Sequence, residues 1–222
     1  MANAPTRLLA ISGAEIMRLV DPARAIGALA DGFKALSSGK VEAPPRPKVD
    51  VPGKGFSLAM LAWTPGQMIA LKTVNVFHGN HAHGLESHQA LVALFNAETG
   101  APVAVLDGAS LTGIRTAAAS VLSVRELARK DAKVALVVGA GVQAREHARQ
   151  LSLARPFEEV RIFARNADAA RVIAATIPSG RAVADLEAAA RTSDVVCLTT
   201  SSATPVIESD WVRDGTHVTS VG

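Results

Sequence analysis

The sequence predicts an α/β protein, in which a Rossmann-type, doubly wound parallel sheet follows an α+β domain. Three observations support this class. Short apolar strands alternate with helical segments from residue 133 to the end, which is typical of a parallel sheet wound by right-handed crossovers. The segment GAGVQA follows the apolar run VALVV and opens a helical pattern. The residues before 116 instead carry several strand-like runs in succession, so we expect domains at 1–116 and 117–222.

The expected elements of the first domain begin with a helix over 14–36, opened by Ser12 and continued through Asp21-Pro22. The segment 43–55 is rich in proline and glycine, which exclude a regular helix. Strands are predicted over 57–63, 68–77, 89–100 and 101–108, with AETGAP as the hairpin turn between the last two. A helix over 114–129, rich in small residues, leads into the second domain.

The second domain is expected to alternate strands and helices. Strands are predicted over 133–138, 159–164, 194–200 and 217–222, and helices over 142–154, 168–177 and 185–193. These lengths suit βαβ units.

Composition excludes several classes of protein. With 222 residues, 49% of them hydrophobic, the chain can bury a sizeable core, and no apolar run reaches the roughly 18 residues of a membrane span. The N-terminal segment has too short an apolar core for an export signal, and one cysteine, Cys197, fits a reducing cytoplasm. A net charge of +3 without basic runs, and 4% aromatic residues, argue against a nucleic-acid partner.

The stretch FHGNHAHGLESHQ, at 77–89, contains four of the six histidines and raises the question of a metal site. The intervals of three, two and five residues match neither the i, i+4 pair of a helical zinc motif nor a thiolate site. We therefore expect no metal here.

The loop GAGVQA has the residues that a phosphate-binding loop needs. Gly139 would permit a tight turn, Gly141 the close approach of the backbone to a pyrophosphate, and Ala144 close packing of the helix that follows. The N–H groups at the helix N-terminus would then bind the phosphates. A glycine pair that serves only a tight turn between strand and helix is the alternative.

The end of the next strand indicates which dinucleotide is bound. NAD-binding domains usually place an acid there, about 20 residues after the loop, to bind the ribose hydroxyls. Here Ala164 is followed by Arg165 and Asn166. An arginine beside an uncharged strand end suits a 2′-phosphate, so NADP(H) is favoured over NAD(H). The alternative is that Arg165 is a solvated charge that flanks its helix.

The segments LKTVNVFHGN, ESHQALVALFNAETGAPVAVLDG and TGIRTAAAS occur in this order before GAGVQA. Together they resemble the ornithine cyclodeaminase/mu-crystallin family over essentially the whole chain. The resemblance implies a substrate and dimerisation domain followed by a Rossmann domain, a homodimer, and activity on small amino or imino acids with a nicotinamide cofactor.

The resemblance also implies roles for individual residues. Arg46, Lys72 and Arg115 match the residues that hold the substrate carboxylate, and Lys72 is the catalytic candidate. The chemistry agrees, because an arginine fork fits a carboxylate, and a lysine within an apolar strand can have its pKa lowered enough to exchange protons. Ser87 occupies the position of a family threonine and keeps the hydroxyl group expected near the cofactor. The further cofactor-binding candidates are Thr116, Val142, Gln143, Asn166 and Thr200.

The His-rich stretch is then the loop and following strand that bring Ser87, His88 and Gln89 to the pocket, whereas His78, His81 and His83 are expected to be variable loop residues. In AMLAW, Leu61 and Trp63 depart from the usual family pattern, which leaves the shape of the substrate pocket open.

Three functions remain open. The first is an NAD(P)H-dependent reductase of a cyclic ketimine or 2-imino acid of the pyrroline-2-carboxylate type. The alternatives are an ornithine cyclodeaminase and a non-catalytic NADP(H)-dependent binder. The resemblance implies, on ordinary domain sizes, roughly 90 to 100 further residues beyond Gly222, so that the chain would stop inside the Rossmann domain. An aspartate expected just past that point would separate a cyclodeaminase from a reductase.

Overall fold

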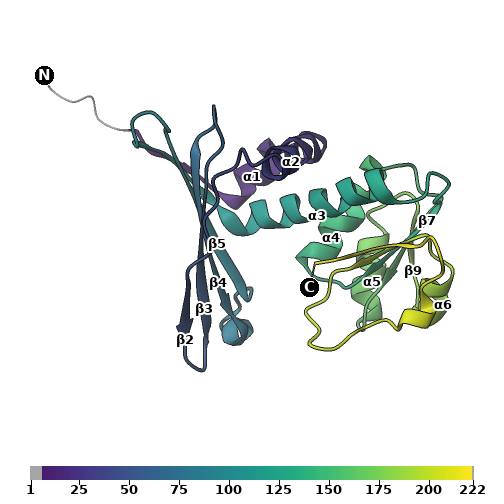
Figure 1. Cartoon of the computed structure of the whole chain (residues 1–222). Coiled ribbons are helices and arrows are strands. Elements are labelled where there is room, and N and C mark those ends of the chain that lie inside the picture. The colour runs from purple at the N-terminus through teal and green to yellow at the C-terminus, as the bar shows by residue number, and fades with distance from the viewer. Residues whose placement is uncertain (1–6, 222) are drawn as a thin grey trace, which may run out of the picture. The chain divides into compact units, whose positions relative to one another are not determined.

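The computed structural model describes residues 7–221, which form two compact units (Figure 1). Of the described residues, the first unit contains 7–21 together with Ala30–Thr112, and the second contains Pro22–Leu29 and 113–221. The boundary predicted after residue 116 falls inside one helix, α3 (Gly108–Leu127), and as a functional division it stays a prediction. Each unit has its own sheet, and the α/β class predicted from the sequence is confirmed.

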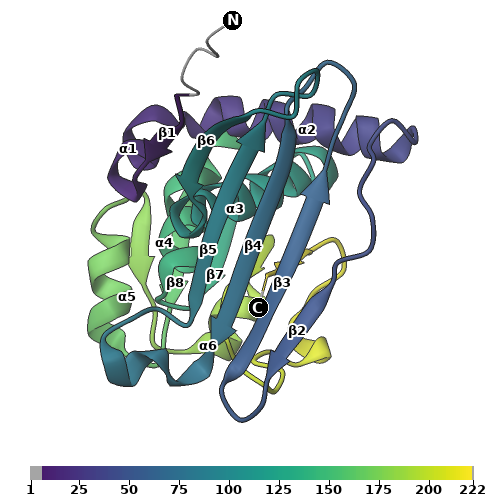
Figure 2. The same ribbon diagram turned by 90° about the vertical axis from the view of Figure 1, so that its left-hand side faces the viewer.

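The first unit is built on a six-stranded sheet with the order β1-β6-β5-β4-β3-β2 (Figure 2). Strands β2 to β6 pair antiparallel, and the short β1 adds in parallel to β6. The hairpin predicted at AETGAP is confirmed, because β5 pairs antiparallel with β6 and Asn96 N–H bonds the Ala101 carbonyl at 2.9 Å. The strands are β1 (Leu9–Ile11), β2 (Lys48–Val51), β3 (Gly55–Ala62), β4 (Ile69–Phe77), β5 (His88–Phe95) and β6 (Pro102–Asp107).

The long helix predicted over 14–36 is wrong in one respect, because the structure breaks it into α1 (Gly13–Leu19) and α2 (Pro22–Ser37). Ser12 caps α1 as expected, in a reciprocal capping box with Glu15. Val20 then turns to an extended conformation. The residue before a proline is disfavoured in the helical region, so Pro22 ends one helix and begins the next.

Two further boundaries differ from the prediction. Helix α3 begins at Gly108 rather than 114, where the Asp107 carboxylate accepts a hydrogen bond from Ser110 N–H at 2.7 Å. The segment 43–55 contains strand β2, because the extended backbone that proline favours continues into pairing with β3.

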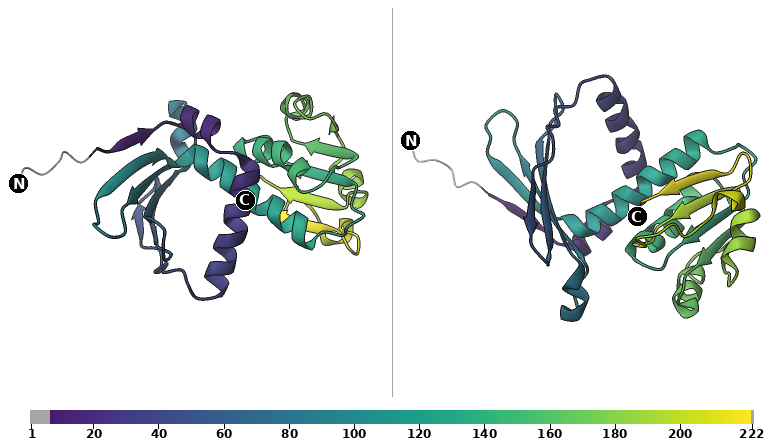
Figure 3. Two further views of the ribbon diagram at one scale, coloured as in Figure 1. Left: turned by 90° about the horizontal axis from the view of Figure 1, so that it is seen from above. Right: turned by 60° about the horizontal axis from the view of Figure 1, so that its bottom comes forward.

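The second unit contains a five-stranded, wholly parallel sheet with the order β11-β10-β7-β8-β9, which confirms the predicted parallel arrangement. Figure 3 shows helices on both faces of this sheet. The strands are β7 (Val134–Val138), β8 (Glu159–Phe163), β9 (Gly180–Ala182), β10 (Val195–Leu198) and β11 (His217–Ser220), and the helices are α4 (Val142–Gln150), α5 (Ala167–Ala174) and α6 (Leu186–Arg191). Short 3-10 helices cover His78–His83 in the first unit, and Leu151–Leu153 and Ser209–Trp211 in the second.

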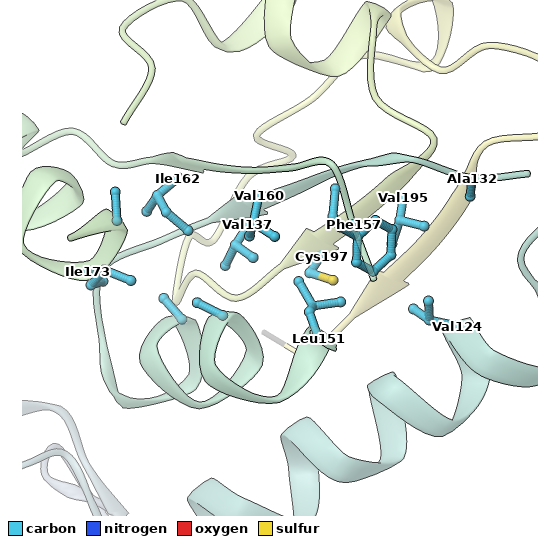
Figure 4. Packing of buried hydrophobic residues seen from close by; sticks show 14 of the residues in the cluster. Val124, Ala132, Val137, Leu151, Phe157, Val160, Ile162, Ile173, Val195 and Cys197 are labelled. Carbon is cyan, nitrogen blue, oxygen red and sulfur yellow. The ribbon is translucent and has the colours of Figure 1, made fainter. Parts of the chain in front are cut away.

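The core of the second unit explains why its strands are continuous apolar runs. Ala135 and Val137 point into a core with residues of α4 and α5, shown in Figure 4, whereas Leu136 and Val138 point into a second core with α6. All four are at most 2% exposed. A strand buried on both faces has no polar side, and this gives VALVV its pattern.

Candidate functional site

The order in which successive strands are added to the parallel sheet reverses at β7. From β7 it passes through β8 to β9 on one side, and then crosses back to β10 on the other side. The loops that follow β7 and β10 therefore leave the same edge of the sheet in divergent directions. In open α/β sheets, ligands bind at this switch point, outside the carboxyl ends of the strands.

The loop after β7 contains the two predicted glycines, and they differ in their surroundings. Gly139 has a φ of +136°, and a Cβ there would lie 2.6 Å from Thr199 Oγ1 and 2.9 Å from the Thr199 carbonyl oxygen. A Cβ on Gly141 would meet no atom within 4 Å. Gly139 is therefore required by the loop itself, whereas the space over Gly141 is open to a ligand.

Helix α4 begins directly at this open space, with Gly141 as its N-cap. Among the described residues, no backbone hydrogen bond occupies the N–H groups of Val142, Gln143 and Ala144. Ala144 is fully buried in the core, so the helix is fixed against the sheet while its N–H groups stay available. Such an end attracts anions through its N–H groups and its dipole.

Helix α3 packs on the start of α4. A Cβ on Gly113 would lie 3.2 Å from Val142 Cγ1. One turn further along α3, Thr116 is 8% exposed, and its Oγ1 has no hydrogen-bond partner among the described residues. The Gln143 Oε1 atom is likewise buried without a partner. Native structures rarely leave buried polar atoms unpaired, so these atoms fit a ligand with polar groups.

These features fit a dinucleotide, because they combine a glycine with open space above it, free helix N–H groups and an orphaned buried hydroxyl. Thr116, Gly141, Val142 and Gln143 are the residues that could hold its pyrophosphate. Thr200 follows β10 at the same edge of the sheet, and its Oγ1 accepts a hydrogen bond from Ser202 N–H at 3.3 Å.

The residues predicted to determine the preference between NADP(H) and NAD(H) follow the end of β8. Ala164 follows the strand, Arg165 is exposed, and no ion pair or hydrogen bond of the Arg165 side chain occurs within residues 7–221. Asn166 caps α5, and its Oδ1 accepts a hydrogen bond from Ala169 N–H at 3.1 Å. Asp168 forms an ion pair with Arg171, so the nearby acid is engaged elsewhere.

In the first unit, Lys72 lies at the middle of β4 between Met60 of β3 and Val92 of β5, the residues directly opposite it. Its side chain is partly buried, and Nζ donates a hydrogen bond to Thr112 Oγ1 at 2.6 Å. Thr112 Oγ1 in turn donates to the Gly108 carbonyl at 2.5 Å. The predicted catalytic lysine is thus half-buried and tethered, with apolar neighbours on both sides.

The two predicted arginines lie on other elements. Arg46 is exposed in the segment before β2, and β3 separates β2 from β4. Arg115 is exposed on α3, within the second unit. Their common role in binding a carboxylate stays a prediction.

The His-rich loop forms the 3-10 helix His78–His83, which ends at Gly84. Ser87 Oγ lies 3.2 Å from His81 Nε2, so His81 orients the hydroxyl that the sequence assigned to cofactor binding. Gln89 Nε2 donates to the Glu86 carbonyl at 2.9 Å, and His88 begins β5 in an exposed position. Within residues 7–221, no three His, Cys, Asp or Glu side chains are grouped as metal ligands would be, and no helix is long and apolar enough to cross a membrane.

The register of the first sheet shows on which face Leu61 lies relative to Lys72. Leu61 pairs with Leu71, whereas Lys72 pairs with Met60. Because side chains alternate between the faces of a sheet, Leu61 lies on the face opposite Lys72. The indole N–H of Trp63 bonds the Gln67 carbonyl at 3.2 Å, within the turn that follows β3. Met60 is the residue of AMLAW that shares the face of Lys72.

A buried polar network supports α4 from inside the second unit. His147, which is fully buried, has Nδ1 2.7 Å from the Gln143 carbonyl and Nε2 2.9 Å from Ser120 Oγ. The carbonyl can only accept, so Nδ1 carries the proton and Nε2 accepts from Ser120. Thr219 of β11 donates to Ser120 at 3.0 Å. Burial lowers the pKa of His147, against the Gln143 carbonyl and Glu146, which raise it, and this favours the neutral ring that the network needs.

Sequence reasoning missed several of these residues. The helix start predicted at 114 leaves Thr112 outside the helix, whereas the observed start at Gly108 puts it within the first turns of α3. The sequence predicts His81 to be a variable loop residue, and no sequence pattern relates it to Ser87. The contact of Thr199 with Gly139 depends on the order of the strands.

Comparison with known proteins agrees with the family resemblance predicted from the sequence. The family model described as the ornithine cyclodeaminase/mu-crystallin family matches residues 8–222. Δ1-pyrroline-2-carboxylate reductase from Thermococcus litoralis, solved with NADH and L-proline, is 32% identical with a TM-score of 0.90, over 96% of this chain and 68% of that one. An archaeal alanine dehydrogenase dimer with bound NAD is 32% identical with a TM-score of 0.88, over 95% and 66%. A lysine cyclodeaminase is 29% identical with a TM-score of 0.81, over 95% and 66%.

The chain thus spans about two thirds of the length of these proteins. The family model covers nearly all of it, and two of these proteins, which are similar to this chain over both of its units, were solved with a bound nicotinamide dinucleotide. The chain belongs to the ornithine cyclodeaminase/mu-crystallin family.

Proposed function

We propose that the full-length protein is a reductase of a cyclic ketimine or 2-imino acid of the pyrroline-2-carboxylate type, and that it uses NADPH. The observation that carries the proposal is Lys72, a half-buried amine held between Met60 and Val92. An amine in such surroundings is suited to exchange a proton with the nitrogen of a small substrate.

The residues of this chain would divide the work as follows. Arg46 and Arg115 would bind the substrate carboxylate, since the planar guanidinium forms two parallel hydrogen bonds to it. Lys72, or a water beside it, would protonate the substrate nitrogen. A bound nicotinamide would supply the hydride that the imine carbon receives. The substrate would thus gain one hydride and one proton and become an amino acid.

The phosphate loop would hold the cofactor. The N–H groups of Val142 and Gln143 would bind the pyrophosphate above Gly141, and the Thr116 hydroxyl and Ser87 would add hydrogen bonds. Asn166 would contribute through its backbone, because its side chain already caps α5. Arg165 supports NADPH over NADH, because it is exposed at the strand end and Ala164 offers no acceptor for a ribose diol.

Turnover tests the proposal. The purified full-length protein should oxidise NADPH when supplied with Δ1-pyrroline-2-carboxylate or a related cyclic imine, as measured by absorbance at 340 nm. If no cyclic or linear imino acid causes oxidation, the reductase proposal is wrong. Ammonia released from ornithine or lysine without net change at 340 nm would indicate a cyclodeaminase, the activity named for one similar structure. Tight binding of an unaltered imino acid in the presence of NADPH would indicate a binder.

We also infer a homodimer formed through the sheet of the first unit. Val49, Leu61 and Leu91 lie on the face opposite Lys72 and are at least 45% exposed, and the strands β1 and β2 form open edges. Exposed apolar faces and open edges are usually covered in an assembly. One similar structure is described as a dimer. A monomer observed by light scattering at micromolar concentration would overturn this inference.

A further inference from the structure

The first turns of α3 hold a hydroxyl against the amine of the candidate catalytic lysine. Thr112 Oγ1 lies 2.6 Å from Lys72 Nζ and 2.5 Å from the carbonyl oxygen of Gly108, four residues earlier on the helix. All three residues belong to the first unit. The contact joins an amine at the centre of the sheet to the backbone of a helix.

The position of this hydroxyl is fixed by backbone packing. A Cβ on Gly108 would lie 2.7 Å from the backbone carbon of Ala90, so the first turn of α3 rests directly on β5. Ala90 pairs with Val74 of β4, two residues from Lys72 on the same face of the sheet. Thr112 and Lys72 therefore lie on elements that are joined by direct backbone packing and by strand pairing.

The direction of the two hydrogen bonds follows from the donors and acceptors. A hydroxyl has one proton, and the Gly108 carbonyl can only accept, so Thr112 donates to Gly108 and presents lone pairs to Lys72. Lys72 must then donate. When the amine is neutral, this hydrogen bond uses one of its N–H groups, and its lone pair takes no part in the contact with Thr112.

We propose that Thr112 is a positioning residue that holds the Lys72 amine in the orientation for proton exchange. The inference rests on the proposed function for its catalytic consequence, whereas the tether itself can be tested without activity. Thr112 touches neither substrate nor cofactor in this account, and it acts through Lys72.

A matched control exists in the second unit. Thr192 Oγ1 donates to the Ala188 carbonyl, four residues earlier, at 2.7 Å and accepts from Arg161 Nη1 at 2.6 Å. Thr192 thus makes the same two kinds of hydrogen bond as Thr112, but it accepts from Arg161 instead of Lys72. Thr112→Val and Thr192→Val each replace a hydroxyl by a methyl group of similar shape, and Thr112→Ser keeps the hydroxyl.

The first readout is the reactivity of Lys72 towards trace acetic anhydride in the full-length protein, measured by mass spectrometry relative to the exposed Lys34. Thr112→Val should raise the relative labelling of Lys72 by about tenfold, which corresponds to ~1.4 kcal/mol. Thr112→Ser and Thr192→Val should label like the parent. Unchanged labelling in Thr112→Val, or an equal rise in Thr192→Val, would overturn the proposed tether.

The second readout is steady-state kinetics with the imino acid. Thr112→Val should lower kcat by about tenfold and leave KM within about twofold, because the residues proposed for carboxylate binding are untouched. Thr112→Ser should restore kcat. A parental kcat in Thr112→Val would overturn the positioning role. An inactive parent enzyme would instead refute the proposed function, and labelling would still decide whether Thr112 holds Lys72.

Discussion

Two glycines in one loop should respond in opposite ways to the same substitution. In Gly139→Ala the new Cβ would lie 2.6 Å from Thr199 Oγ1, on a backbone with φ of +136° that side-chain-bearing residues rarely adopt. Backbone strain of about 1–3 kcal/mol and overpacking of similar size predict a loss of roughly 3 kcal/mol or more in the free energy of unfolding. This is a large share of the ~5–15 kcal/mol of a typical domain.

In Gly141→Ala the Cβ would enter open space, and the φ of −79° is one that alanine adopts readily. The poorer N-cap costs about 0.5–1 kcal/mol, and the stiffer unfolded chain offsets about 0.4–1 kcal/mol, so stability should stay within about 0.5 kcal/mol of the parent. Dinucleotide binding should weaken by at least about tenfold, because the methyl group would occupy the space through which a pyrophosphate approaches.

Denaturant unfolding and calorimetric titration with NADPH measure both quantities. The parent protein should be stable and bind NADPH. Gly139→Ala should be unstable, and Gly141→Ala should be stable but bind NADPH weakly. Parental NADPH affinity in Gly141→Ala would refute the assignment of the open space to the cofactor. Parental stability in Gly139→Ala would refute the packing argument for the loop.

Three further predictions concern the second unit. Arg165→Ala should raise the Michaelis constant for NADPH roughly ten- to a hundredfold and leave that for NADH nearly unchanged, and Ala164→Asp should shift the preference towards NADH; an Arg165→Ala variant indifferent to the 2′-phosphate would show that this arginine only flanks its helix. Burial lowers the pKa of His147 and of His217 below the ordinary 6.5. Just below pH 6.5 these histidines therefore bind protons in the unfolded chain but stay neutral in the folded chain. Stability is thus fully present above pH 6.5 and should fall below it, by at most about 1.4 kcal/mol per pH unit for His147, and denaturant unfolding of His147→Gln should show a smaller slope between pH 6.5 and 5.5. Burial raises the pKa of Cys197 to about 12, so a thiol reagent at pH 8 should modify the unfolded chain and spare the folded one; rapid modification of the native protein would contradict the buried position.

The sequence was sufficient to predict the parallel sheet because its central strands are buried on both faces. VALVV and VVCL are then continuous apolar runs, and turn signals separate them from helices. The strands β1 and β9, of three residues each, were not predicted, because a run of that length carries no period. The break between α1 and α2 could have been predicted, since Asp21 precedes a proline.

In the candidate site, too, local features could be predicted from the sequence, whereas contacts between distant residues could not. The glycine loop could be placed between a strand and a helix because the apolar run before it and the helical pattern after it are visible in the sequence, and its binding of phosphate stays a prediction. The contacts of Lys72 with Thr112, and of Gly139 with Thr199, join residues that are far apart in the chain. They depend on strand register, strand order and the start of α3, which local patterns do not determine. Strand register likewise determines that Met60, and not Leu61, shares the face of Lys72.

The central claim is that the full-length protein reduces a C=N bond with a hydride from a nicotinamide. It is tested most directly with NADPH deuterated at both C4 positions, supplied with Δ1-pyrroline-2-carboxylate in ordinary water. Mass spectrometry and proton NMR of the product should find one deuterium, carried at Cα of proline, and none on nitrogen after exchange with solvent. Proline that carries no deuterium, or a substrate that is recovered unchanged, would contradict the account.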